Sequence, residues 1–280
     1  MHLLSFYPRQ RASDGHILRL IIVGSGRAAG TLALATSTAG HHLVGVLARS
    51  KDHGLGPSLD WDSRLPEADV VLVAVSDDAI SEVVERLQGH VDRIAVIAHL
   101  SGFVPVTSLH PLQESGMAVG GFHPLVSMPD PTSGVSSLSG AFVGIGGDVL
   151  AVDTLTHLAK SLGLEPFRLE DHARPAYHAA AAAAANFVVT SLAVSDDLLA
   201  SVDIDHEVLR PLVSHVVENV FDKGAAESLT GPIARGDVET VIGHLTAANE
   251  VSEFVGTQFG LLAEATSVRA GRDQDLKQWK

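Results

Sequence analysis

The sequence predicts an α/β protein: an N-terminal, mostly parallel sheet with helices on both faces, followed by a smaller all-helical domain. Three observations predict this fold. Short apolar runs alternate with helical segments up to about residue 170, which is typical of a parallel sheet buried on both sides. A glycine-rich turn follows the first apolar run. From Pro175 onward the sequence shows only helical patterns.

The elements of the first domain follow in order. We expect strands within the apolar runs at residues 17–23, 41–50, 68–75, 92–99, 116–125, 140–148 and 165–169. We expect helices over residues 31–40, from a cap at Asp77 or Asp78 to residue 88, and over residues 149–163. Residues 18–170 therefore form the predicted first domain, and residues 1–17 a ragged N-terminal extension.

The second domain is expected over residues 171–280. Pro175 suits a first-turn position of a helix that runs to about Ala200. Further helices are expected over residues 205–221, after a cap at Asp237, and over residues 249–270, with a frayed tail beyond.

The composition excludes several classes of function. Lys plus Arg number 19 against 33 Asp plus Glu, a net charge of -14, whereas a general nucleic-acid binder needs a basic face. The absence of cysteine excludes disulfides, thiolate zinc sites and cysteine nucleophiles. We read neither a membrane span nor a signal peptide, because the charged pair Asp196–Asp197 follows the alanine run, and we expect a cytoplasmic protein.

The glycine-rich turn "GSGRAAG" predicts a dinucleotide site. Gly24 permits a tight turn, Gly26 lets a pyrophosphate approach the backbone, and Ala29 lets the helix pack close to the strand. The helix N-terminus then faces the phosphates. We therefore expect Gly24, Ser25, Gly26, Arg27 and Ala28 to bind the pyrophosphate; the alternative is a tight turn without a ligand.

The end of the second strand favours NADP over NAD. NAD-binding proteins place an acidic residue there, but this chain offers Arg49, Ser50 and Lys51. A guanidinium group binds a phosphate through two hydrogen bonds. We expect Arg49 and Ser50 to bind the 2′-phosphate; the alternative is that these charges are only solvated.

Polar residues end three further strands, where ligands of parallel sheets bind. They are Ser76 with Asp77, His99 with Ser101, and His123. We expect Ser76, Asp77 and Ser101 beside the cofactor. His99 and His123 can supply a proton near neutral pH, although a structural role is an alternative for each. A metal site of His99, His123 and His178 is disfavoured, because no carboxylate has ligand spacing with them.

The run "YHAAAAAAAN" places His178 and Asn186 on one helix, about 80° apart around its axis. Both can face one groove, where Asn186 holds a substrate carbonyl or the nicotinamide amide; a satisfied core asparagine is the alternative. Because this helix is apolar on nearly every face, we expect burial all round, with the helix after Asp205 on one side. A second copy covers the rest, which predicts a homodimer through the helical domain.

The loop "GPIARGD" contains two charged residues, Arg235 and Asp237. Arg235 can clamp a substrate carboxylate while Asp237 orients the loop. The alternative is structural, with Asp237 as a helix N-cap and Arg235 bound to carbonyl groups.

Together these segments resemble a known family. "GSGRAAG", "VSDDAI", "HLSG", "GFHPL", "YHAAAAAAAN" and "LTGPIARGD" are similar to bacterial Rossmann-like predicted oxidoreductases with a C-terminal domain of unknown function 2520. The plan is similar to that of pyrroline-5-carboxylate reductase, ketopantoate reductase and 6-phosphogluconate dehydrogenase. The resemblance implies NAD(P)-linked hydride transfer, a helical domain of the 6-phosphogluconate dehydrogenase C-terminal type, and dimers. Relatives often use a lysine in the second domain as the acid, but here the next lysine is Lys223.

These observations lead to one hypothesis and one alternative. The hypothesis is an NADP-dependent reductase of a small 2-oxo or imino acid, acting at the interdomain cleft. His123, His99, His178 and Asn186 are its candidate catalytic residues, and Tyr177, Arg235 and Asp237 its candidate substrate-binding residues. The alternative is a catalytically inactive dinucleotide-binding sensor or partner subunit.

Overall fold

The computed structural model describes residues 16–91 and 94–279, in two compact units, Met1–Ala182 and Ala183–Lys280. Nearly all of the predicted N-terminal extension, and residues 92–93 of the predicted fourth strand, lie outside the described residues. The sheet ends close to the expected boundary at residue 170. The helix that follows it groups with the first unit as far as Ala182.

The first unit is built on a seven-stranded sheet with the order β2-β1-β3-β4-β5-β6-β7. Its strands are β1 (Arg19–Val23), β2 (His42–Leu47), β3 (Ala68–Val73), β4 (Ile94–His99), β5 (Ala118–Pro124), β6 (Phe142–Gly147) and β7 (Glu165–Arg168). β1 to β5 are parallel, β6 is antiparallel to β5, and β7 is parallel to β6. The mostly parallel sheet predicted from the sequence is confirmed.

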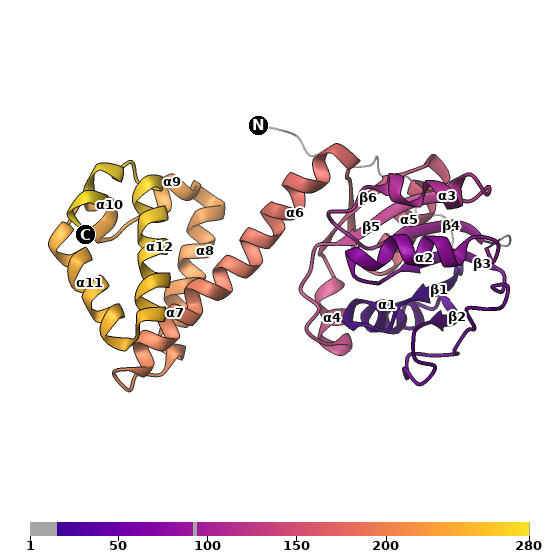
Figure 1. Ribbon diagram of the computed structural model, residues 1–280, viewed down its shortest axis with the longest axis horizontal. Helices are drawn as coiled ribbons and strands as arrows, with labels where there is room; N and C mark the ends of the chain where they lie inside the picture. The colour runs from indigo at the N-terminus through magenta and orange to yellow at the C-terminus, as the bar shows by residue number, and fades with distance from the viewer. Residues whose placement is uncertain (1–15, 92–93, 280) are drawn as a thin grey trace. The chain divides into compact units, whose positions relative to one another are not determined.

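Helices cover both faces of this sheet (Figure 1). Because side chains alternate along a strand, Leu20 and Ile22 of β1 enter one core while Ile21 and Val23 enter the other. The first core also contains residues of α1 (Arg27–Thr38), α4 (Pro131–Leu138) and α5 (Val149–Ser161). The second contains residues of α2 (Ile80–Leu87), η2 (Val106–Leu109) and α3 (His110–Gln113).

Glycines on β5 and β6 allow the segment that follows β7 to pack closely against the sheet. A Cβ atom on Gly121 would lie 2.1 Å from Nη2 of Arg174, and one on Gly146 would lie 2.3 Å from the carbonyl oxygen of Leu169. A Cβ on Gly144 would lie 2.8 Å from Cδ2 of Leu169. Side chains at these positions would therefore lift the segment from Leu169 to Arg174 off the sheet.

A continuous helical stretch leads from the first unit into the second. It comprises η3 (Asp171–Ala173), α6 (Arg174–Ala182), the π-turn η4 (Ala183–Phe187) and α7 (Val188–Ala200). By length and composition alone, the stretch from Asp171 to Ala200 could cross a membrane, and the expectation that the chain has no membrane span stays a prediction. This is weak evidence, because helices of soluble proteins pass the same test.

The second unit contains only helices. After α7 come η5 (His206–Leu209), α8 (Arg210–Lys223), α9 (Ala225–Ser228), α10 (Pro232–Arg235), α11 (Val238–Val251), α12 (Glu253–Arg269) and η6 (Asp273–Gln278). The last long helix begins later than expected, because the side chain of Ser252 accepts a hydrogen bond from the backbone N–H of Val255 and caps it.

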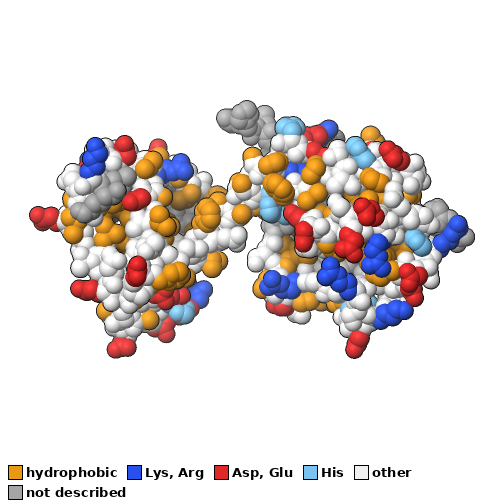
Figure 2. Space-filling view, viewed as in Figure 1, with side chains coloured by type: hydrophobic (Ala, Val, Ile, Leu, Met, Phe, Trp, Pro, Cys, Tyr) orange, Lys and Arg blue, Asp and Glu red, His pale blue; other side chains and the backbone are white. Residues whose placement is uncertain are grey.

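The core of the second unit is small. It contains Val194 of α7, Ala248 of α11 and Val255 of α12. In the single chain Val194 is the buried residue of α7, so the expected burial of residues 175–200 on all sides stays a prediction that depends on the second copy. α8 was expected to cover one side of that helix, but no α8 residue is buried. Many apolar side chains of this unit are therefore exposed (Figure 2).

Candidate functional site

The turn after β1 requires glycine at position 24. Gly24 has a φ of 120°, a conformation that residues with a side chain rarely adopt. A Cβ atom would lie 2.3 Å from the carbonyl oxygen of Ala74, and the Gly24 N–H donates to the carbonyl of Leu47 at 2.7 Å. The turn is thus held against the ends of β2 and β3.

The next glycine leaves space in front of α1. Gly26 is the N-cap residue of α1 and provides no side-chain cap, and a Cβ atom there would meet no described atom within 4 Å. Ser25, Gly26 and Arg27 are exposed and Ala28 is half-buried. Free N–H groups at a helix start, beside an open backbone, suit a pyrophosphate. The residues present therefore fit a dinucleotide.

The close packing of α1 takes a form that sequence reasoning did not predict. Ala29 is fully buried, as expected for the third position of the motif. The tighter contact is made by Gly30, where a Cβ atom would lie 2.8 Å from Cγ of Pro131 on α4. The last glycine of "GSGRAAG" therefore serves the contact between two helices.

The end of β2 presents an exposed cationic loop. Arg49 and Ser50 are both exposed, while Nζ of Lys51 is paired with the carboxylate of Asp60 at 3.1 Å. Of the two cations, Arg49 is the better placed to bind a phosphate group. After β3, a hydrogen bond from the exposed Ser76 lowers the pKa of Asp78, and Arg49 adds to that shift.

Three side chains meet at the end of β5. Nδ1 of His123 lies 2.8 Å from the hydroxyl oxygen of Tyr177, and the ring centroids are 5.4 Å apart. The His178 ring lies 5.8 Å from that of His123 and 6.3 Å from that of Phe103. The structure therefore brings together His123, Tyr177 and His178, all of which the sequence analysis singled out.

Gly102 closes this cluster on one side. A Cβ atom there would lie 2.8 Å from Nε2 of His123 and 2.8 Å from Cδ2 of His178. Ser101 stabilises the turn, because its hydroxyl accepts hydrogen bonds from the N–H groups of Phe103 at 3.1 Å and Val104 at 2.8 Å. The Ser101 hydroxyl thus has a structural partner, and its predicted contact with a cofactor stays a prediction.

The cluster is neutral at its centre. Burial, together with the neighbouring His178 and Arg174, lowers the pKa of His123 to about 4. Burial raises the pKa of Tyr177 to about 12. At pH 7 His123 is thus an uncharged imidazole beside a protonated phenol, and it carries no extra proton to donate.

His99 lies next to the cluster at the end of β4. It is fully buried, and neither ring nitrogen has a well-formed hydrogen bond within the described chain, although the carbonyl of Pro105 favours its protonated form. Burial lowers the pKa of His99 to about 4, and Arg174 contributes to the shift. His99 is therefore a buried neutral group behind the cluster.

Sequence reasoning missed Arg174 and Asp171. Arg174 is fully buried; its Nε donates to Asp171 at 2.9 Å and its Nη1 donates to the carbonyl of Ser101 at 2.9 Å. One signal existed in the sequence. An arginine at the start of a helix is electrostatically unfavourable there, so its presence indicates a specific partner.

The remaining predicted residues belong to the second unit. Asn186 is exposed in the π-turn, so the predicted 80° separation from His178 does not apply, because a π-turn changes the phase of the helix. Asp237 caps α11 by accepting hydrogen bonds from Thr240, and Arg235 is exposed at the end of α10. Their contact with a substrate stays a prediction.

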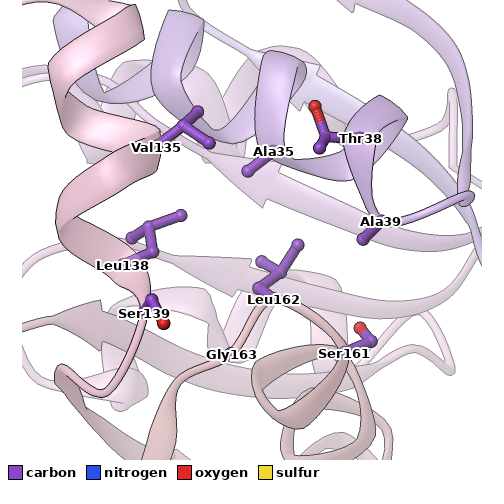
Figure 3. A pocket seen from close by; sticks show the side chains of 9 residues that line it. All are labelled: Ala35, Thr38, Ala39, Val135, Leu138, Ser139, Ser161, Leu162 and Gly163. Carbon is purple, nitrogen blue, oxygen red and sulfur yellow. The ribbon is translucent and has the colours of Figure 1, made fainter.

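One concave region lies away from these residues. A cavity of about 300 Å³ is lined by residues at the ends of α1, α4 and α5, among them Leu138 and Leu162 (Figure 3). It is at the end of α1 opposite to Gly26, and it contains no predicted site residue. Among the described residues, no group of three or more His, Asp or Glu could hold a metal ion.

Two family patterns match the chain. A Rossmann-like domain matches residues 10–124, and the Domain of unknown function (DUF2520) matches residues 141–265. The two matches lie one after the other and together span most of the chain. The resemblance inferred from the sequence motifs is confirmed. No curated protein sequence matches the chain.

Solved structures share the fold over nearly the whole chain. A Bacteroides fragilis protein described as a candidate NADP oxidoreductase is 20% identical, with a TM-score of 0.77 over 90% of this chain and 98% of that one. An imine reductase from Myxococcus stipitatus in complex with NADP+ is 15% identical, with a TM-score of 0.62 over 93% and 98%. Pyrroline carboxylate reductase from Plasmodium falciparum, with NADP bound, is 13% identical, with a TM-score of 0.55 over 90% and 98%. The chain shares its fold with these three proteins.

Proposed function

We propose that this protein is an NADP-dependent oxidoreductase that reduces a small imino or 2-oxo acid. One observation carries the proposal. The open turn at Gly24 and Gly26 and the cluster around His123 lie at the same edge of one sheet, because both follow the carboxyl ends of parallel strands. The same edge of the sheet would therefore carry both the nucleotide site and the polar reaction site.

Each end of the nucleotide has candidate partners. The N–H groups from Ser25 to Ala28 would hold the pyrophosphate, and Arg49 with Ser50 would hold the 2′-phosphate. Ser76, Asp77 and Ser101 remain candidates for contacts further along the cofactor. The fold shared with NADP complexes supports this order of sites.

The neutral imidazoles of His123 and His99 favour an imine over a 2-oxo acid. When bound, the reduced nicotinamide supplies the hydride. An imine that is already protonated becomes an amine without another proton, whereas the oxygen of a 2-oxo acid needs an acid. His123 and His99 are both neutral at pH 7, so neither is such an acid. Tyr177 instead holds the His123 ring in place and leaves Nε2 beside Gly102.

Because His123 and His99 are neutral and cannot act as the acid, a second candidate is also favoured. It is a nucleotide-binding protein without turnover. NADPH oxidation with a panel of cyclic imines and 2-oxo acids separates the two. Turnover with an imine supports the proposed reaction. Tight NADPH binding without turnover on any substrate of the panel supports the inactive sensor or partner subunit.

We also propose a homodimer formed through the helical unit. Leu212, Val216 and Val220 form an exposed apolar stripe on α8, at 59%, 46% and 39% exposure, and Phe221 is 86% exposed. The core of this unit around Val194 is small, so burial of the stripe would add to its stability. A second copy of the same surface would bury this stripe.

We propose a cytoplasmic location, where a reductase finds reduced nicotinamide. Cell fractionation tests this location. Recovery of the chain with membranes would contradict it and would give the apolar helix from Asp171 to Ala200 a different role.

A further inference from the structure

Arg174 is a costly residue to bury. It is fully inaccessible to solvent, yet guanidinium groups remain charged at every physiological pH. It also occupies the first position of α6, where the helix dipole disfavours a positive charge. Its Nη2 atom has no hydrogen-bond partner in the described chain. Its position at the start of the helix disfavours the positive charge, and its hydrogen-bond donors are not all satisfied. A charge that is buried at this cost indicates a specific role for Arg174.

The contacts of Arg174 join three segments. Its guanidinium lies over Gly121 of β5, in the space that the sheet glycines leave free. Nη1 donates to the carbonyl of Ser101, and Nε donates to Asp171. Asp171 in turn accepts hydrogen bonds from the N–H groups of Val106 at 2.8 Å and Thr107 at 3.3 Å. Arginine and aspartate thus hold both ends of the loop from residue 101 to residue 107.

We propose that Arg174 is a positioning residue that holds Gly102 against the imidazoles of His123 and His178. The bonded carbonyl of Ser101 belongs to the peptide that continues directly into Gly102, so the guanidinium fixes the orientation of that peptide. Because the space beside Gly102 is too small even for a Cβ atom next to the two imidazoles, a shift of this peptide would change the cluster.

The charge of Arg174 has a second effect on the same cluster. The titratable and charged groups that act on His123 are His178 and Arg174 of α6, Asp77 of η1 (Asp77–Ala79) and His99 of β4, while Tyr177 is bonded to its ring. Burial is the largest influence on the His123 imidazole, and the fixed guanidinium adds to it. Arg174 therefore helps to keep Nε2 of His123 available as a neutral hydrogen-bonding group.

The protonation state of His123 tests the proposal without any turnover. In the full chain, the His123 ring signals can be assigned in NMR spectra by comparison with His123→Gln. In the unmodified protein they should not titrate between about pH 5.5 and 8. In Arg174→Gln the pKa of His123 should rise measurably, whereas Arg174→Lys, which retains the charge, should keep it low.

Arg168→Gln is the matched control, because Arg168 is an exposed arginine paired with Glu170 near the same segment. It should leave the His123 signals unchanged. A His123 that titrates near 6.5 in the unmodified protein overturns the inference, even if Arg174→Gln does not fold. So does a folded Arg174→Gln protein with an unmoved pKa. Neither result depends on whether the protein reduces an imine.

Discussion

At the scale of single residues, surroundings decide what His123 can do. Its side chain type suggests an acid near neutral pH, but burial lowers its pKa to about 4. The bond between its Nδ1 atom and the Tyr177 hydroxyl leaves only Nε2 for a ligand. A neutral, oriented imidazole can bind a substrate and place it, which differs from the proton transfer suggested by the sequence.

Replacing His123 by alanine should lower turnover by about 10² while NADPH affinity stays nearly unchanged. The reason is that His123 lies in the cluster with Tyr177 and His178, away from the turn at Gly26. Steady-state kinetics and calorimetry measure the two quantities. His157→Ala, on α5 outside the cluster, is a control that should retain turnover. Full turnover in the His123→Ala protein would contradict a role for this residue.

Arg49 should decide the preference for NADPH. If its guanidinium binds the 2′-phosphate, Arg49→Ala should weaken NADPH binding by about tenfold or more and leave NADH binding nearly unchanged. Calorimetry with both cofactors measures the change. Lys51→Ala is a suitable control, because Lys51 is already paired with Asp60. Equal affinities for NADPH and NADH in the unmodified protein would rule out the assignment of Arg49.

Acid should destabilise the first unit through its buried histidines. His99 and His123 have pKa values near 4 when folded, below the ordinary value of 6.5. Between these values the unfolded chain binds more protons, so stability falls as the pH drops from 6.5 to 4, by up to about 1.4 kcal/mol per pH unit for each histidine. Urea unfolding at several pH values measures this slope. The double variant His99→Gln, His123→Gln should show a shallower slope, and an equal slope would contradict the assignment.

Single residues also show where sequence reasoning stopped. His99, Ser101 and His123 were predictable because each follows an apolar strand, and the carboxyl ends of parallel strands share one edge. Arg174 was not, because its partners lie on a loop 73 residues earlier and in glycines that carry no chemical signal of their own.

At the scale of elements, the turn from β1 to α1 contains two glycines with different roles. Gly24→Ala would combine a φ of 120° with a contact of 2.3 Å to Ala74, and it should lower the free energy of unfolding by several kcal/mol. Gly26→Ala meets no described atom within 4 Å, so the fold should persist while a methyl group occupies the space for the pyrophosphate. Thermal unfolding and NADPH calorimetry distinguish these outcomes. Unchanged NADPH affinity in Gly26→Ala would place the pyrophosphate elsewhere.

The elements themselves were predictable where their patterns are strong. All seven strands appear because each is a short apolar run between turns. The helix α4 was not predicted, since "PTSGVSSL" has weak helical propensity; Asp130 caps it through the N–H groups of Thr132 and Ser133. The π-turn at Ala183–Phe187 was also missed, because a run of alanines favours a regular α-helix.

At the scale of the whole molecule, the exposed apolar side chains of the second unit should be covered by a second copy. Light scattering should give twice the chain mass of 29.3 kDa. Phe221→Glu should produce monomers or insoluble protein, because a charge would enter the proposed interface. Val149→Glu, at a residue that is 80% exposed on α5, is the matched control and should leave assembly unchanged. A monomeric mass for the unmodified protein at micromolar concentration would refute the dimer.

The contacts of Arg174 and Asp171 also set an order of assembly. The turn at Gly24 is completed by Leu47 and Ala74, so it can form early during synthesis. The loop from residue 101 to residue 107 must wait for partners 65 and 73 residues later in the chain. Because the chain is synthesised from its N-terminus, the partners of the nucleotide turn become available before those of the histidine cluster. A nascent chain that has reached β7 would therefore hold a nucleotide turn while its cluster still lacks Tyr177 and His178.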